Sequence, residues 1–216
     1  MTSYIALLRA VNVGGTGKLP MAELREMCES LGFEDVRTYI ASGNVVFRSD
    51  RDASALKAAL EERLGEYAGK PVGVVIRTGA EMAEVHARNP FPDAPGNWTV
   101  AIFLDRSPAP NALESVRNQG AERIELGARE IYVAYGEGMG RSRLSIPAAE
   151  SGTARNMNEH RREAGRDGDG VTISGPTTGT AAARMALDHG STESNPSRHS
   201  RSSRIRRARS ASGNSW

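Results

Sequence analysis

Hydrophobic residues in the first third of the chain follow two periods in turn. Runs of apolar and β-branched residues have the length of strands, while apolar residues spaced three and four apart form stripes typical of amphipathic helices. The predicted strands cover residues 4–9, 36–41, 45–48 and 71–77, and the predicted helices cover residues 20–31 and 56–64. Their order, β-α-β-β-α-β, is that of the ferredoxin-like (split βαβ) fold. We therefore expect residues 3–77 to form an antiparallel sheet with two helices.

The same alternation of periods returns after a break. Residues 80–88 predict a connecting helix, and three prolines among residues 89–96 end regular structure. The predicted elements that follow are a strand over residues 98–104, a helix over 111–118 and a hairpin of strands 122–126 and 130–135. This β-α-β-β order predicts a second, similar α+β unit, either a separate subdomain or an extension of the first sheet. We place the two units at residues 1–78 and 79–158.

The last part of the chain, residues 159–216, has a different composition. It is rich in Arg, Ser and Gly, contains no Lys, and has few large apolar side chains. Such a segment buries too little apolar surface to offset the entropy lost on folding, so we expect a disordered tail. Its arginines between residues 198 and 209 resemble a nucleic-acid-binding arm. No aromatic residues are interleaved with them, so nucleic-acid binding is not expected.

Global composition gives little reason to expect a nucleic-acid or membrane partner. The formal net charge is only +2, and no apolar run approaches the roughly 18 residues that a membrane span needs. The chain also opens without a signal-like pattern, so we expect a soluble, cytoplasmic protein. The single cysteine, Cys28, lies on the apolar stripe of the first helix and is expected to be buried rather than catalytic.

A glycine-rich loop between the first strand and the first helix is the first candidate site. Residues 12–18 read Asn-Val-Gly-Gly-Thr-Gly-Lys. The N–H groups of residues 14–17 at a helix N-terminus, with Arg9 and Lys18 as countercharges, suit a phosphate or carboxylate. The loop fits neither the phosphate-loop motif, which needs Ser or Thr after the lysine, nor the Rossmann motif. The alternative is that the glycines only shape the turn.

Two further polar segments are candidates, and each has a plain structural alternative. Ser42 and Asn44 can aim a hydroxyl and an amide at one ligand, or can satisfy a hairpin turn. Ser142, between two arginines, can help to clamp an anion or can cap a short helix. If an anion binds, Arg9, Lys18 and Asn44 should surround one concavity. The histidines match no metal-ligand spacing, so we expect neither a metal nor a cofactor.

Several of these segments resemble the motifs of one known family. Its opening motifs are similar to Leu-Arg-Ala-Val-Asn-Val-Gly-Gly at 8–15, Lys-Leu-Pro-Met at 18–21 and Ser-Gly-Asn-Val-Val-Phe at 42–47. The segments 138–142 and 153–156 resemble its later motifs. The family is domain-of-unknown-function family 1697 (DUF1697), and the resemblance covers about residues 3–158. It implies a bacterial cytoplasmic α+β protein with a ferredoxin-like half and no established activity, and it adds Arg155 and Asn156 to the candidate residues.

The chain departs from this family after Asn156. Members that resemble it continue with an aromatic residue, Asn and Thr into a final amphipathic helix. Here Met157 and Asn158 lead into Glu-His-Arg-Arg and then into the tail. A shifted reading frame in a GC-rich gene would produce this abrupt loss of the aliphatic pattern.

Two functional hypotheses follow from the sequence. The first is a protein that binds a phosphate-bearing or other anionic small molecule, and whether it is also an enzyme stays open. The second is a non-catalytic module that binds RNA or another protein on an open sheet face, although the strands lack the paired aromatics that stack bases. The candidate ligand-binding residues are Arg9, Asn12, Gly14, Gly15, Lys18, Ser42, Asn44, Arg141, Ser142, Arg155 and Asn156.

Overall fold

The first of two α+β units in the chain is built on a four-stranded sheet. The computed structural model describes residues 1–9, 19–39, 43–136 and 138–157. The first unit contains β1 (Thr2–Leu8), α1 (Met21–Ser30), β2 (Glu34–Tyr39), β3 (Asn44–Ser49), α2 (Ala53–Ala68) and β4 (Val74–Thr78). The sheet is antiparallel, with the order β2-β3-β1-β4. The predicted elements of this half are therefore present in the predicted order.

The two long helices of this unit begin where the sequence provides start signals. Pro20 precedes α1, and the Asp52 carboxylate accepts hydrogen bonds from the main-chain N–H groups of Ser54 and Ala55 at the start of α2. Gly69, with a φ of 66°, ends α2 in the left-handed region that glycine tolerates best. The buried residues of the two helices fall on the predicted apolar faces and are Leu24, Met27 and Cys28 in α1 and Leu56, Leu60 and Leu64 in α2.

The second unit repeats the strand order of the first. A connecting helix, α3 (Gly79–Ala87), leads to β5 (Thr99–Phe103), β6 (Arg123–Leu126), β7 (Glu130–Ala134) and β8 (Thr153–Asn156). Short 3-10 helices stand between them: η1 (Gly96–Trp98), η2 (Ala112–Ser115), η3 (Met139–Arg141) and η4 (Pro147–Ala149). The sheet order β6-β7-β5-β8 matches β2-β3-β1-β4 strand for strand. The α+β class predicted from the sequence is confirmed for the described residues.

The sequence reading of the second unit needs two corrections. The helix expected over residues 111–118 is only the short 3-10 helix η2, because Val116 has extended backbone and Arg117 pairs with Ser145 in a β-bridge. The segment Thr153–Asn156, which was noted only as a motif, forms the edge strand β8 against β5. Four residues with one β-branched side chain carry little strand signal, so this strand depends on its partner.

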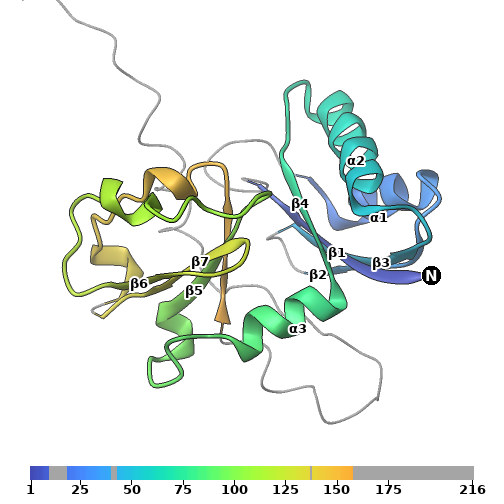
Figure 1. The fold of residues 1–216 in the computed structure, drawn as a ribbon. Helices are drawn as coiled ribbons and strands as arrows, with labels where there is room; N and C mark the ends of the chain where they lie inside the picture. The colour runs from blue at the N-terminus through green and yellow to red at the C-terminus, as the bar shows by residue number, and fades with distance from the viewer. Residues whose placement is uncertain (10–18, 40–42, 137, 158–216) are drawn as a thin grey trace, which may run out of the picture.

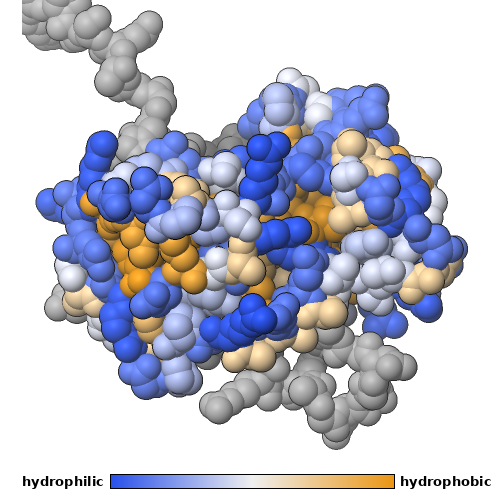
Figure 2. Space-filling view, viewed as in Figure 1, coloured by the Kyte–Doolittle hydropathy of each residue, from blue (hydrophilic) through white to orange (hydrophobic). Residues whose placement is uncertain are grey.

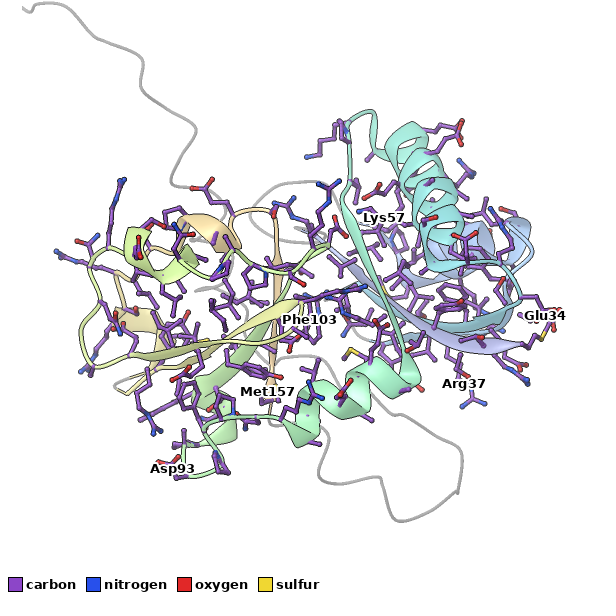
Figure 3. The ribbon with its side chains drawn as sticks, viewed as in Figure 1. Glu34, Arg37, Lys57, Asp93, Phe103 and Met157 are labelled. Atoms are coloured by element: carbon purple, nitrogen blue, oxygen red, sulfur yellow. The ribbon has the colours of Figure 1, made fainter. Side chains whose placement is uncertain are left out.

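Three apolar layers pack against the two sheets, and one of them joins the two units. One layer lies between the helices α1 and α2 and the first sheet. A second layer joins the other face of that sheet, through Ile5, Leu7 and Val75, to α3 and to the second sheet, where Phe103 and Met157 lie (Figure 3). A third layer covers the far face of the second sheet. The face of the first sheet that α1 and α2 leave free is thus covered by the second unit (Figure 1).

A polar connection accompanies this layer at the surface. The Lys57 ammonium of α2 donates to the carboxylates of Glu61 and Asp105, each at 2.8 Å, and to the Val74 carbonyl at 2.7 Å. Asp105 follows β5, so the bridge joins the two units. Figure 2 shows a mostly hydrophilic surface with two apolar areas, one over the second unit near β6 and β7 and one beside β4. No helix among the described residues is long and apolar enough to cross a membrane.

Cys28 is expected to resist alkylation in the native protein. It lies on the buried face of α1, and burial raises the pKa of its thiol from 9.0 to about 12, so little thiolate is present at neutral pH. Iodoacetamide at neutral pH should label it only after denaturant is added, and rapid labelling without denaturant would contradict this. Because the unfolded thiol ionises at a lower pH than the folded one, stability should fall as the pH rises from 9.0 to about 12.

Candidate functional site

The guanidinium of Arg155 joins the two units at the point where β1 ends. Arg155 lies on β8 and is 8% exposed. Its Nε donates to Asn44 Oδ1 at 2.6 Å, and its Nη2 donates to the Leu8 carbonyl at 3.2 Å. Its Nη1 donates to Thr153 Oγ1 at 2.6 Å and to the Ala154 carbonyl at 2.8 Å. One side chain of the second unit therefore holds the ends of β1 and β3 of the first.

This junction carries a buried positive charge. Burial lowers the pKa of Arg155 from 12.5 to about 10, so the guanidinium stays protonated at neutral pH. The acceptors of the four hydrogen bonds are neutral amide, hydroxyl and carbonyl oxygens.

Arg155 also fixes the orientation of the Asn44 amide. A guanidinium has only N–H donors, so the atom of Asn44 that faces it must be the carbonyl oxygen. The amide nitrogen Nδ2 then points the other way. Asn44 is fully buried, and its Nδ2 has no hydrogen-bond partner among the residues that the structure describes. Because a buried donor without an acceptor costs about 1–3 kcal/mol, this nitrogen is placed to meet an acceptor.

Arg9 brings a second guanidinium to the same end of β1. Its main-chain N–H donates to the Gly73 carbonyl at 2.8 Å and extends the pairing of β1 with β4. Its side chain lies against Gly73, where an added Cβ would come within 2.9 Å of Arg9 Cδ. Its Nη2 donates to the Glu150 carbonyl at 2.6 Å. Arg9 is partly exposed.

Three candidate residues, Arg9, Asn44 and Arg155, thus belong to one junction. The other candidates of the first unit, Asn12, Gly14, Gly15, Lys18 and Ser42, lie outside the described residues, as does the tail that was expected to be disordered. The expected convergence of Arg9 and Asn44 with Lys18 therefore stays a prediction. Asn156 does not face the junction: it follows Arg155 on β8, and successive side chains of a strand point to opposite faces.

Arg141 and Ser142 do not belong to the junction. They line a pocket of about 230 Å³ where β6 begins and β7 ends. Its other lining residues are Asn118, Gly120, Ala121, Glu122, Tyr135, Gly136, Gly138 and Arg143. Tyr135 packs in the apolar layer on the far face of the second sheet, whereas Arg155 pairs with Ala101, which lies in the layer between the units. The sequence candidates therefore divide between two faces of this sheet.

Of the two alternatives considered for Ser142, the structure does not show the cap at the start of a helix. Ser142 follows the 3-10 helix η3 and does not begin a helix. Its hydroxyl donates its one hydrogen to Glu122 Oε1 and accepts from the main-chain N–H of Leu144 at 3.1 Å. It therefore has no hydrogen left to offer an anion. What Ser142 does is orient a carboxylate that the sequence reading did not single out.

A second buried arginine was also missed. Arg77 of β4 is 2% exposed, and its Nη2 donates to the carbonyls of Leu104 at 2.6 Å and Arg129 at 2.8 Å. Burial, and after it the nearby Arg129 charge, lower the pKa of Arg77 to about 10. Its guanidinium lies 5.7 Å from the centre of the Phe103 ring. The sequence does offer one signal for this contact between the units, because Arg77 directly follows the apolar run Val74–Ile76.

The described residues contain no group of three or more His, Cys, Asp or Glu side chains placed to hold a metal ion. The junction offers N–H donors and positive charge, which suit an oxyanion and not a cation. The pocket beside β6 offers one carboxylate and two arginines. The two places differ in the chemistry that they can bind.

The fold and the junction define a two-sheet α+β protein whose halves meet on buried arginines. Residues 1–132 match the family described as "Protein of unknown function (DUF1697)", so the chain belongs to this family, as its motifs predicted. The structure is similar to that of the conserved bacterial protein SP0830 from Streptococcus pneumoniae, with a TM-score of 0.57 and 24% identity. That match covers 72% of this chain and 92% of the other, and at this identity it supports the fold alone. No curated protein matches the chain.

Proposed function

We propose that the protein binds a small anionic molecule, carrying a phosphate or carboxylate, at the junction between Arg9 and Asn44. The observation that carries this proposal is the buried Asn44 Nδ2, which Arg155 turns away from itself and which has no acceptor among the described residues. Residues 12–18, which follow Arg9 closely in the chain, hold the glycines that the sequence reading assigned to an anion-binding loop. We assign no reaction to this site.

Exchange of Asn44 for aspartate tests the proposal with little change in shape. Asn44→Asp keeps an oxygen for the Arg155 Nε and replaces the Nδ2 donor by a negatively charged acceptor. Inorganic phosphate at about 100 times its dissociation constant should stabilise the wild type by about 2.7 kcal/mol. This corresponds to a rise of about 5–10 °C in melting temperature for a chain of this size. The variant should lose this rise.

The control for added charge is Asn97→Asp, since Asn97 is exposed and lies outside the junction. It should keep the full response to phosphate. An equal phosphate response in wild type, Asn44→Asp and Asn97→Asp would show a general salt effect and would rule out the proposed site. Acetate in place of phosphate distinguishes a carboxylate site from a phosphate site.

The other hypothesis, a non-catalytic module that binds RNA or protein on an open sheet face, has less support. Ile5, Leu7 and Val75 on the face away from α1 and α2 pack against the second unit, so this face is not free in the described part of the chain. We also infer that the first unit is ferredoxin-like, which its element order and its strand order support. A cytoplasmic, bacterial protein remains part of the proposal.

A further inference from the structure

The pocket beside β6 is a second polar site, separate from the junction. Its lining comes from two segments of the chain: one leads into β6 and the other follows β7. Its volume of about 230 Å³ is smaller than the pockets that hold drug-sized ligands. A molecule that fills it is therefore small. The charged side chains that line the pocket in the described part of the chain are Glu122, Arg141 and Arg143.

The carboxylate of Glu122 is fixed in its place. Ser142 Oγ donates to Oε1, and the main-chain N–H of Gly120 donates to Oε2 at 2.6 Å. Burial opposes the charged form, but these hydrogen bonds outweigh it and hold the pKa of Glu122 below its ordinary value. Each carboxylate oxygen can accept a further hydrogen bond. Glu122 is thus a charged, oriented acceptor at the wall of the pocket.

Arg141 and Arg143 supply the positive charge of the pocket lining. Neither Arg141 nor Arg143 has a hydrogen-bond or ion-pair partner among the residues that the structure describes, and both side chains are exposed. They lie directly before and after Ser142, the residue that orients Glu122, so all three side chains come from the same short segment. The lining therefore combines two unpaired guanidinium groups with one fixed carboxylate.

We propose that this pocket binds a small zwitterion. Its phosphate or carboxylate pairs with Arg141 and Arg143, and its ammonium donates to Glu122. A simple anion fits less well, because the Glu122 charge repels it, and a simple cation fits less well, because the two arginines repel it. A molecule with both groups satisfies all three side chains at once. The site lies on the far face of the second sheet from Arg155 and does not depend on the function proposed for the junction.

Matched ligands test this with the full-length wild-type protein. Phosphoethanolamine carries a phosphate and an ammonium, β-alanine carries a carboxylate and an ammonium, and ethyl phosphate carries a phosphate alone. Calorimetric titration should show at least one zwitterion binding about tenfold more tightly than ethyl phosphate, since its ammonium adds a hydrogen bond to the charged Glu122 carboxylate. Tighter binding of phosphoethanolamine indicates a phosphate site, and tighter binding of β-alanine indicates a carboxylate site. Equal binding of all three ligands, or binding of none, overturns the proposal.

Variants assign the two ends of the ligand. Glu122→Gln should remove the preference for the zwitterion and leave the affinity for ethyl phosphate unchanged or higher, whereas Glu114→Gln, at an exposed position, should change nothing. The double variant Arg141→Gln with Arg143→Gln should weaken every anionic ligand, and Arg106→Gln is its exposed control. A zwitterion preference that survives in Glu122→Gln contradicts the proposal. Circular dichroism verifies that each variant is folded. If a variant does not fold, the comparison of the three ligands on the wild-type protein still decides the proposal.

Discussion

Replacement of Arg155 by methionine is expected to lower the free energy of unfolding by about 3–5 kcal/mol, because several buried acceptors are left without a donor at about 1–3 kcal/mol each. Methionine fills much of the same space but donates no hydrogen bond, so Asn44 Oδ1, Thr153 Oγ1 and the Leu8 carbonyl lose a donor that burial prevents water from replacing. The loss falls on the contact between β8 of one unit and β1 and β3 of the other. Both units should therefore be affected.

Urea unfolding followed by far-ultraviolet circular dichroism measures this loss. Arg106→Met is the matched control, because Arg106 is exposed, and it should change the free energy of unfolding by no more than about 0.5 kcal/mol. Asn44→Leu removes the acceptor instead of the donor and should also destabilise the protein, since it leaves Nε of Arg155 without this bond. A loss for Arg155→Met as small as that of the control would mean that the buried hydrogen bonds do not hold the units together.

Phe103→Ala should have an effect of similar size, about 3–5 kcal/mol, because it opens a cavity in the layer between the units. Phe103 is 2% exposed and lies in the same apolar cluster as Ile5 and Leu7 of the first sheet. Its ring also faces the buried Arg77 guanidinium. Removal of the ring takes away both the apolar packing and this cation–π contact.

Phe103→Leu separates volume from aromatic character. It keeps most of the buried apolar surface and should cost less than the alanine variant, about 1.5 kcal/mol or less if the neighbours repack. Thermal unfolding of the wild type should be a single transition, since the shared layer couples the two units. Two separate transitions in the wild type, or a negligible effect of Phe103→Ala, would contradict the view that this layer joins them.

The first unit was readable from the sequence because its elements are long and strongly patterned. Leu56, Leu60 and Leu64 repeat at helical spacing along one face, and this repeat predicted α2, which extends beyond the predicted residues 56–64 to Ala53–Ala68. The second unit was harder to read because 3-10 turns take the place of its helices. β8 has four residues and depends on β5 for its hydrogen bonds, so its own sequence carries little information.

The junction was predicted only in part, for a physical reason. The motif that contains Arg155 was recognised by family resemblance, and Asn44 was recognised as a polar turn residue. Their contact joins residues 111 positions apart in sequence and exists only once the two sheets have packed together. Nothing in the local periodicity of either strand specifies that packing. In the same way, the partner of Ser142 proved to be Glu122, which lies 20 positions earlier at the start of another strand.

The most direct test of the proposed function follows the side-chain amide of Asn44 by NMR during a titration with inorganic phosphate. Its ¹H–¹⁵N signals are identified by their absence from the spectrum of Asn44→Asp. If Nδ2 donates to a bound anion, these signals should shift downfield and saturate, while the side-chain signals of the exposed Asn97 stay in place. Asn44 signals that do not move up to phosphate concentrations that perturb Asn97 would contradict the assignment of an anion site to this junction.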